Sequence, residues 1–331
     1  MKVNRGMKIL ITGAYGFVGT NLCKHLTERG HQCDALDVSA AKRDNVPYQS
    51  FYTWSDLDSS PSPISFTSYD AVVHLAGKAH DLKKVASETS YFDINVGLTK
   101  RIFDALCQQV KMKGEGEQRK VAFIYFSSSK ASADGNAYGR SKLAAEQFLQ
   151  SQHSNNLNIR TIILRPAMIH GPGNKGNLNL LWGIVRRGLP WPLAAFENKR
   201  SFTSIGNICA AVEALCEGKV KVEGEGEQRN SAIFFVADDE MLSTNRLIEL
   251  IAATCGKRAK LWRIPKGLMR LAAKIGDVAH LPLNTERIEK LTEDSFVDNA
   301  ALKKALGWDK MPVSAEDGMR TTLRSFLSTP V

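Results

Sequence analysis

The sequence predicts an α/β fold in which a doubly wound, parallel sheet is followed by a smaller C-terminal lobe. Two observations support this prediction. Apolar runs of strand length alternate with segments of helical periodicity that span 12 or more residues, which is the pattern of βαβ units. The runs at 71–75 and 121–126 have no polar alternation, as is typical of parallel strands that are buried on both faces.

The elements of the first half follow this alternation in order. Residues 8–11 predict the first strand, and apolar residues at i, i+4 and i+8 predict a helix from Phe17 to about Arg29, which Gly30 ends. Further strands are predicted at 33–37, 71–75, 121–126 and 159–164, and further helices at about 91–110 and 138–152.

Beyond Pro166 the composition changes. Glycine and proline are concentrated between residues 171 and 192, and such clusters favour loops. Later helices are predicted at about 205–216, 243–255 and 300–306, with a strand at 232–236. We therefore predict two domains, residues 1–165 with the alternating elements and residues 166–331 mainly as the smaller lobe, with some elements returning to the first sheet.

Composition is that of an ordinary globular protein. The 331 residues are 43% hydrophobic and 24% charged, with a formal net charge of +10. This apolar content excludes intrinsic disorder, and no apolar run approaches the roughly 20 residues of a membrane span. The six cysteines form no CxxC pair and no metal-ligand spacing, so we expect free thiols, no metal and a cytoplasmic location. The basic residues occur as scattered pairs, and we expect neither a nucleic-acid nor a membrane partner.

A glycine-rich turn follows the first predicted strand. Gly13, Gly16 and Gly19 open the first helix with the spacing GxxGxxG, and Asp37 follows 18 residues after the last of them, at the end of the next strand. Such glycines let the backbone approach a pyrophosphate at the helix N-terminus, and the carboxylate accepts hydrogen bonds from the adenosine ribose. This context predicts a Rossmann-type dinucleotide site, with an ordinary βα turn as the alternative.

Two further groups of residues are candidates for chemistry. Tyr138 and Lys142 are four residues apart, hence neighbours on one face of a predicted helix. An ammonium beside a phenol, whose usual pKa is about 10, should lower that pKa and let Tyr138 exchange a proton with a sugar hydroxyl. Taken alone, such a pair is also compatible with a solvated helix contact. Ser127, Ser128 and Ser129 follow a strand at the edge where parallel sheets bind ligands, although serine there can also cap a turn.

Together these residues resemble the NAD-dependent epimerase/dehydratase family of the extended short-chain dehydrogenase/reductase superfamily. The resemblance covers nearly the full chain. It narrows, in segments 176–178, 187–190 and 198–202, to 4-epimerases and 4-keto reductases of nucleotide sugars in bacterial surface-polysaccharide synthesis. It implies that Tyr138 is the catalytic acid/base, that Lys142 is its partner, and that Ser128, or else Ser129, bonds the sugar 4-oxygen.

The resemblance also implies the ligand contacts. The implied contacts of the cofactor are Gly13, Tyr15, Gly16, Phe17, Val18, Gly19, Asp37, Leu75, Ala76, Gly77, Asn95, Lys142 and Pro166. Asn177 and Arg200 are implied as contacts of a nucleotide diphosphate, since a guanidinium matches phosphate in a bidentate manner. NAD is expected rather than NADP because Asp37 repels a 2′-phosphate, although Lys42 and Arg43 could bind one.

The implied function is epimerisation at C4 of a UDP-hexose or UDP-N-acetylhexosamine. The alternative is NAD(P)H-dependent reduction of a 4-keto-6-deoxy nucleotide sugar, because both reactions use the same residues. A non-catalytic, dinucleotide-sensing regulator is the alternative of another class, but such proteins typically lose the tyrosine or the lysine. The substrate is therefore expected to be a UDP-linked nucleoside diphosphate sugar, and the assembly is expected to be a homodimer.

Two departures from the family pattern stand near the catalytic residues. Ser129 and Lys130 occupy the positions where related dehydratases carry an Asp-Glu pair, so dehydration is not expected. Only 10 residues separate Ser128 from Tyr138, a shorter loop than is usual in the family. The short loop could open the site or move Ser128 out of register.

Overall fold

The chain forms two compact units in the computed structural model, which describes residues 6–38, 46–79, 87–112, 120–152, 158–174, 177–219, 231–279 and 284–328. Unit 1 comprises Met1–Ala167, Ile208–Val236 and Asn299–Lys310. Unit 2 comprises Met168–Asn207, Ala237–Asp298 and Met311–Val331. Each unit is therefore built from three separate segments of the chain.

Unit 1 is built on a seven-stranded sheet with the order β3-β2-β1-β4-β5-β6-β9, in which every pair is parallel. Its strands are β1 (Lys8–Thr12), β2 (Gln32–Asp37), β3 (Phe51–Thr53), β4 (Ala71–His74), β5 (Val121–Phe126), β6 (Ile159–Pro166) and β9 (Ser231–Val236). The order reverses between β1 and β4, and ligands of open α/β sheets bind at such a switch point. The α/β prediction is confirmed.

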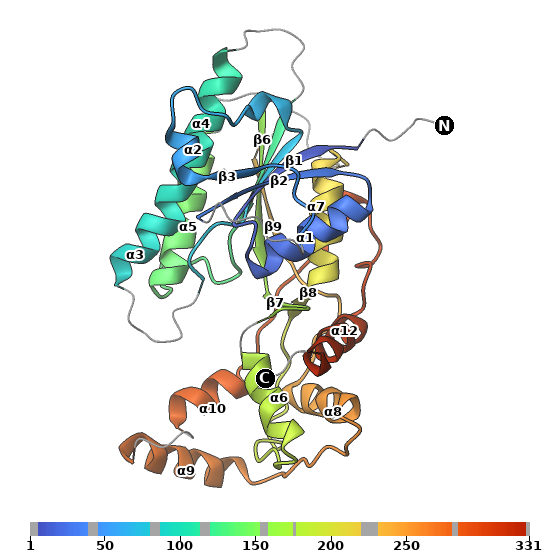
Figure 1. Cartoon of the computed structure of the whole chain (residues 1–331). Coiled ribbons are helices and arrows are strands. Elements are labelled where there is room, and N and C mark those ends of the chain that lie inside the picture. The colour runs from blue at the N-terminus through green and yellow to red at the C-terminus, as the bar shows by residue number, and fades with distance from the viewer. Residues whose placement is uncertain are drawn as a thin grey trace. The chain divides into compact units, whose positions relative to one another are not determined.

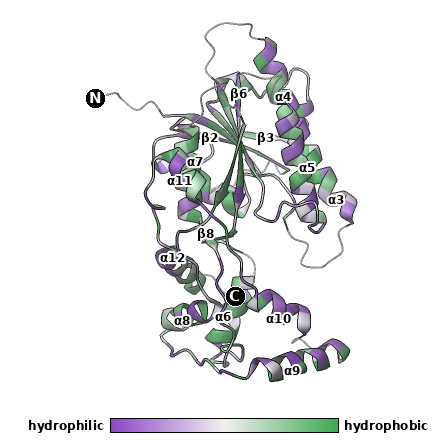
Figure 2. Cartoon of the chain, turned by 180° about the vertical axis from the view of Figure 1, so that it is seen from behind, coloured by the Kyte–Doolittle hydropathy of each residue, from purple (hydrophilic) through white to green (hydrophobic). Residues whose placement is uncertain are grey.

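Helices cover both faces of this sheet. The helical elements are α1 (Phe17–Glu28), α2 (Trp54–Asp58), a 3-10 turn (Phe66–Ser68), α3 (Glu88–Phe92), a π-helical turn (Asp93–Gly97), α4 (Leu98–Met112), α5 (Ala137–Ser151), α7 (Ile205–Cys216) and α11 (Ala300–Leu306). In Figure 1, α1 and α7 lie on one side of the sheet, and α4 and α5 lie on the other. The strands are strongly hydrophobic (Figure 2), and Phe103 of α4 meets Phe123 of β5 edge to face at 5.1 Å between ring centroids.

Unit 2 is mainly helical. It contains β7 (Met168–His170) and β8 (Phe202–Ser204), which form a two-stranded parallel sheet, and the helices α6 (Asn177–Arg186), α8 (Thr244–Thr254), α9 (Lys266–Val278), α10 (Thr285–Thr292) and α12 (Ala315–Leu327). Its core surrounds Trp182, whose ring meets Phe326 edge to face at 5.5 Å. None of the helices in the described parts of the chain is both long and apolar enough to cross a bilayer.

One predicted element differs in detail from the structure. The segment 91–110, predicted as a single helix, is α3, the π-helical turn and α4 in succession. An inserted residue in a π turn changes which side chains face inward, and such turns are frequent at functional sites. Here the turn places Asn95 in the interior.

Candidate active site

The glycine-rich turn joins β1 to α1 in unit 1. Gly13 has a φ of +65°, and a Cβ there would lie 2.8 Å from the backbone nitrogen of Ala76. A Cβ on Gly19 would lie 2.6 Å from the carbonyl oxygen of Gly13. Only glycine fits these positions. Gly16 is the N-cap of α1, and no side chain caps the helix. The N–H groups of its first turn are therefore suitably placed for a phosphate.

Asp37 ends β2 beside this turn. One of its carboxylate oxygens accepts the N–H of Tyr15 at 2.9 Å, and the other accepts that of Val38 at 2.7 Å. Each oxygen has a further lone pair, so the carboxylate can also accept ribose hydroxyls. The alternative phosphate-binding pair, Lys42 and Arg43, lies outside the described residues.

The segment after β4 faces the same turn. The N–H of Ala76 donates to Thr12 Oγ1 at 3.1 Å. A Cβ on Gly77 would lie 2.8 Å from Asn95 Oδ1 and 3.2 Å from Lys142 Nζ. The Asn95 amide is used within the protein, because Oδ1 accepts the Lys78 N–H at 2.8 Å and Nδ2 donates to Ser141 Oγ at 2.8 Å. Asn95 thus joins this segment to α5, and its direct contact with a cofactor stays a prediction.

Tyr138 lies in the first turn of α5. Its pKa is raised above the ordinary value by burial, and a hydrogen bond from Ser128 opposes that rise. The short loop between the two residues folds tightly, since the N–H of Ala131 donates to the Ser128 carbonyl at 3.0 Å. A Cβ on Gly139 would collide with the carbonyl oxygen of Lys130. The loop therefore keeps Ser128 beside Tyr138 rather than moving it out of register.

Lys142 is buried one turn further along α5. Its Nζ donates to the carbonyl oxygen of Phe126 at 2.8 Å and lies 4.9 Å from the ring centroid of Tyr125. Burial lowers the pKa of Lys142 to about 8, against an opposing effect of Glu146. We expected the ammonium to lower the pKa of Tyr138, and this is wrong for the structure: desolvation of the phenol raises the pKa, and Ser128 is the group that opposes the rise.

Behind Lys142 lies a network that the sequence analysis missed. Glu146 is completely buried and accepts hydrogen bonds from Arg165 Nε at 2.9 Å, from Arg165 Nη2 and from the hydroxyl of Ser127. The hydroxyl of Ser127 is thus directed to Glu146, whereas Ser128 bonds Tyr138. Glu146 stands four residues after Lys142 on the same helix, and this spacing could have indicated from the sequence that the two side chains are neighbours.

A second missed group adjoins Tyr138. The Tyr91 ring of α3 meets the Tyr138 ring edge to face at 6.4 Å, and Lys78 Nζ lies 5.3 Å from the Tyr91 ring centroid. Arg140 of α5 pairs with Glu88 of α3 at 2.6 Å. This pairing is a second contact between α3 and the helix that carries Tyr138, and it leaves Tyr91 beside the Tyr138 phenol.

His74 is buried and plays a structural part. Its Nδ1 lies 2.7 Å from Thr12 Oγ1 and its Nε2 lies 3.0 Å from Thr99 Oγ1. Burial, together with the charge of Lys142, lowers the pKa of His74 to about 3. The imidazole is neutral at physiological pH and its two nitrogens are engaged.

The two residues implied for the nucleotide diphosphate belong to unit 2. Asn177 begins α6, and its side chain lies outside the described atoms. Arg200 pairs through its backbone with Leu242, and its Nη1 donates to the carbonyl oxygen of Lys290 at 2.9 Å. Burial lowers the pKa of Arg200, and Glu293 opposes this. The structure brings the predicted cofactor and catalytic residues together within unit 1 and leaves this pair in unit 2.

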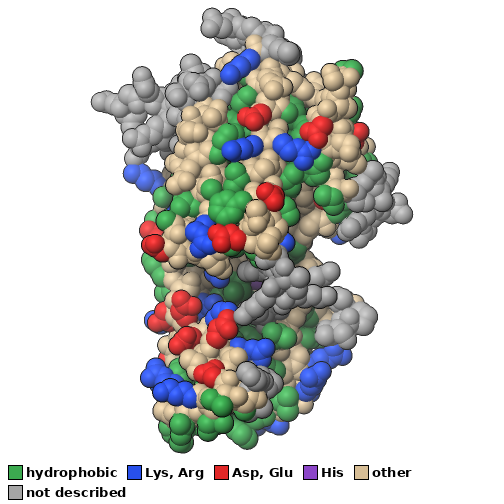
Figure 3. All heavy atoms as spheres, turned by 90° about the vertical axis from the view of Figure 1, so that its left-hand side faces the viewer, with side chains coloured by type: hydrophobic (Ala, Val, Ile, Leu, Met, Phe, Trp, Pro, Cys, Tyr) green, Lys and Arg blue, Asp and Glu red, His purple; other side chains and the backbone are tan. Residues whose placement is uncertain are grey.

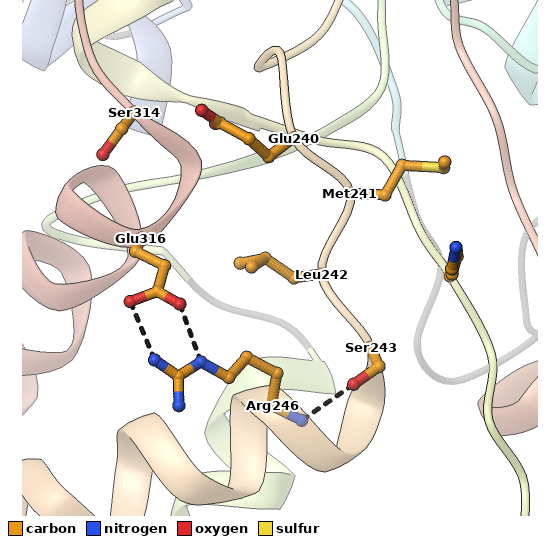
Figure 4. Close-up of a pocket in the computed structure, with 8 residues that line it drawn as sticks. Glu240, Met241, Leu242, Ser243, Arg246, Ser314 and Glu316 are labelled. Atoms are coloured by element: carbon orange, nitrogen blue, oxygen red, sulfur yellow. Dashed lines mark hydrogen bonds and ion pairs between the residues drawn. The ribbon is translucent and has the colours of Figure 1, made fainter.

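A cavity of about 620 Å³ lies in unit 2 between the first turns of α8 and α12. Figure 4 shows that Arg246 forms a two-pronged ion pair with Glu316, with bonds of 2.7 and 2.9 Å. Ser243 caps α8, and Glu240 accepts the N–H of Ala315 at 3.0 Å. The polar side chains of Arg246, Glu316, Ser243 and Glu240 thus have hydrogen-bond partners within the protein. We therefore interpret the cavity as the space between two helix N-termini and assign it no ligand.

One group of possible metal ligands occurs among the described residues, namely His31, Glu213 and Glu217. His31 Nδ1 accepts the N–H of Met7 at 3.1 Å, which leaves the ring proton on Nε2, 3.4 Å from Glu213. An N–H rather than a lone pair therefore faces the carboxylates. This arrangement suits a hydrogen bond and not a metal ion.

Comparison with known proteins bears on both sequence and fold. Residues 9–224 match the family described as NAD dependent epimerase/dehydratase. UDP-glucose 4-epimerase of Vibrio cholerae is 28% identical over 96% of this chain and 95% of its own. UDP-2-acetamido-2,6-beta-L-arabino-hexul-4-ose reductase of Pseudomonas aeruginosa is 34% identical over 88% of this chain and 66% of its own. The Bordetella bronchiseptica enzyme WbmF, solved with NAD+ and UDP, is similar in fold, with a TM-score of 0.70, 17% identity and coverage of 98% of this chain and 93% of that one.

Proposed function

The chain belongs to the NAD-dependent epimerase/dehydratase family, and on that premise we propose that it is an NAD-dependent epimerase acting at C4 of a UDP-hexose or UDP-N-acetylhexosamine. One observation carries the proposal. Tyr138, hydrogen-bonded by Ser128, stands on the same helix as buried Lys142, whose Nζ abuts Gly77 beside the glycine-rich turn. A proton-transfer group and a dinucleotide turn are thus parts of one site.

Each residue has a separate part in the proposed reaction. The Tyr138 phenolate takes the proton of the sugar 4-hydroxyl and returns it when the ketone is reduced. Ser128 bonds the sugar 4-oxygen and stabilises the phenolate, and Lys142 contributes the positive charge. A bound nicotinamide would accept the hydride of C4 and give it back. Burial and the neighbouring Tyr91 raise the pKa of Tyr138, and the hydrogen bond from Ser128 acts against that rise because it stabilises the phenolate.

The preference for NAD(H) is part of the proposal. Asp37 accepts two backbone N–H groups and keeps lone pairs for ribose hydroxyls. Its negative charge repels a 2′-phosphate. The presence of NAD in WbmF, a protein of similar fold, is consistent with this choice.

Reduction of a 4-keto nucleotide sugar is the second candidate. Its support is the 34% identity with the Pseudomonas aeruginosa reductase, against 28% with the Vibrio cholerae epimerase. The same three residues, Ser128, Tyr138 and Lys142, serve one reduction instead of an oxidation followed by a reduction.

One experiment separates these reactions. The purified protein is denatured, the released nucleotide is identified, and the native protein is incubated with UDP-glucose or UDP-N-acetylglucosamine while products are followed by NMR. An epimerase releases tightly held NAD and forms the 4-epimer without added cofactor. A reductase gives neither result and consumes NADH or NADPH with a 4-keto sugar. Binding of NAD without turnover of any of these sugars would support the dinucleotide-sensing regulator instead.

The nucleotide diphosphate is tested separately at Arg200. A buried phosphate charge requires cationic or N–H partners, and Arg200 is proposed as one of them. Calorimetry with UDP, UDP-N-acetylglucosamine and free N-acetylglucosamine should show that Arg200→Ala weakens binding of the two diphosphates only. Arg263→Ala is the matched control, since Arg263 is an exposed cation of the same unit, 74% exposed in its side chain. No affinity of the wild type for UDP, or equal effects of both substitutions, would remove Arg200 from the proposed site.

A further inference from the structure

Helix α9 of unit 2 has two apolar faces, of which only one is covered. The covered face consists of Met269, Ala273 and Gly276, which are buried. The second face consists of Leu268 (59% exposed), Leu271 (56%), Ile275 (58%) and Val278 (83%). At 100° per residue these four side chains fall within a sector of about 80°. A surface helix of a globular protein normally presents one apolar stripe, turned toward its core, and the second face of α9 has no covering partner among the residues of unit 2 that the structure describes.

The remaining face of α9 is basic. Lys266, Arg270 and Lys274 lie on it and are exposed. Segment 257–279 contains seven Lys or Arg residues and one acidic residue, Asp277, and so supplies more than half of the net charge of +10. The Asp277 carboxylate accepts the N–H of Thr285 at 2.9 Å and the hydroxyl of the same residue. Among the described residues, no carboxylate forms an ion pair with Arg270 or Lys274.

A tryptophan precedes the helix. Trp262 is 56% exposed, and its backbone is fixed because its N–H donates to the Trp191 carbonyl oxygen at 2.9 Å. Tryptophan combines an apolar ring with a polar N–H, and it is enriched where an apolar phase meets water. Figure 3 shows hydrophobic side chains between basic ones on the surface of unit 2.

We propose that α9 docks unit 2 onto a membrane surface that contains anionic phospholipids. The exposed apolar face enters the boundary between headgroups and acyl chains, and the basic face binds the headgroups, as in interfacial amphipathic helices. This proposal revises two expectations drawn from the sequence, that the basic residues are merely scattered and that there is no membrane partner. Those expectations excluded a spanning segment, whereas α9 would lie in the plane of the surface.

A second copy of the chain fits this surface less well than a lipid surface. A two-fold symmetric contact through α9 would place the same basic segment against itself, and like charges across an interface are unfavourable. A charge-only ligand such as a polynucleotide would leave Leu268, Leu271, Ile275 and Val278 in water. Anionic lipid satisfies the charge and the apolar face together.

Co-sedimentation with vesicles tests the proposal on the full chain. Wild-type protein should bind vesicles of phosphatidylcholine and phosphatidylglycerol (3:1) at least about 10-fold more tightly than pure phosphatidylcholine, and salt should weaken this binding. Leu271→Ser/Ile275→Ser and Arg270→Glu/Lys274→Glu should each reduce binding to the mixed vesicles about 10-fold or more. Leu180→Ser on α6 is the matched control, because Leu180 is likewise exposed, by 68%, and it should bind as wild type.

Four results would overturn the proposal. The first is no binding, or equal binding to neutral and anionic vesicles. The second is loss of binding in the charge variant only, which would show a purely electrostatic surface. The third is loss in the Leu180→Ser control as well. The fourth is a molar mass, measured by sedimentation equilibrium, that falls in Leu271→Ser/Ile275→Ser alone, which would assign this face to contact between copies. Melting temperatures equal to wild type confirm that the variants are folded, as expected for substitutions of exposed side chains.

Discussion

Replacement of Glu146 by Gln tests how the site controls the charge of Lys142. Glu146 lies four residues after Lys142 on α5, so the two Cβ atoms are about 6 Å apart. With an effective dielectric constant of about 20, one unit charge at that distance contributes roughly 3 kcal/mol, equivalent to a pKa change of about 2. Burial already lowers the pKa of Lys142 to about 8, with Glu146 acting in the opposite direction. We therefore expect Glu146→Gln to lower the pKa of Lys142 further and to increase the neutral fraction of the amine at pH 7.

The measurement is the titration of the Lys142 side chain by NMR, in protein labelled with ¹³C at lysine Cε. The resonance is assigned by its absence in Lys142→Met. Ser127→Ala is the matched control, since it removes a hydrogen bond to Glu146 but no charge, and it should leave the titration nearly unchanged. A folded Glu146→Gln protein in which Lys142 still titrates near 8 would refute the reasoning.

The variant must also tolerate a broken ion pair. Arg165 loses the carboxylate that now accepts bonds from its Nε and Nη2, and breaking a buried pair can cost about 3–5 kcal/mol. Glutamine keeps the shape and one acceptor oxygen, and the Arg165 side chain is 18% exposed, so we expect the lower part of that range. Glu146→Gln/Arg165→Met, which leaves no arginine without its carboxylate, provides a second protein if the first is too unstable, with a smaller expected lowering of the Lys142 pKa because the positive charge of Arg165 is removed as well.

Three further outcomes are expected. Tyr138→Phe should lower turnover by roughly 10²- to 10⁴-fold in the NMR product assay with little change in substrate binding, because the ring remains and only the acid/base is lost; near-normal turnover would exclude Tyr138 as that group. Wild type should use NAD(H) at least about 10-fold better than NADP(H) in kcat/KM, and Asp37→Asn should narrow that ratio by removing a repulsive charge; a wild-type preference for NADP(H) would contradict the assignment of Asp37. Lys142→Met should raise the free energy of unfolding at pH 7 by up to about 3 kcal/mol, since the ammonium is buried at a cost that corresponds to a pKa of about 8 instead of 10.5. Denaturant unfolding at several pH values should show the full gain in stability below pH 8. The gain should shrink between pH 8 and pH 10.5, because in this interval the folded wild type has released the Lys142 proton whereas the unfolded chain still holds it.

The sequence predicted best the parts of the site that are local in the chain. The glycine-rich turn and Asp37 could be predicted because a strand, a turn, a helix and a second strand follow one another within about 30 residues. Tyr138 and Lys142 could be paired because helical spacing brings positions i and i+4 together.

The missed features depend on contacts between distant segments or on burial. Glu146 pairs with Arg165 of β6 and bonds Ser127 at the end of β5, and no spacing rule connects those elements. The desolvation that raises the pKa of Tyr138 depends on packing that the sequence does not reveal. Helix α9 was not predicted because its apolar residues occupy two faces and so produce no single stripe.

The route of the chain through its two units determines how the protein can be made and divided. Strand β9, from residues 231–236, pairs with β6 from Thr161 to Pro166, although the first segment of unit 2, Met168–Asn207, lies between them in the sequence. A fragment that stops after Ala167 would therefore lack β9 and α11 and would expose the backbone of β6 along its whole paired length, a template for aggregation. On the ribosome, the sheet reaches its full width only after residue 236 has emerged. Unit 1 therefore cannot be separated as one continuous segment, and dividing the chain after Ala167 would yield two incomplete pieces.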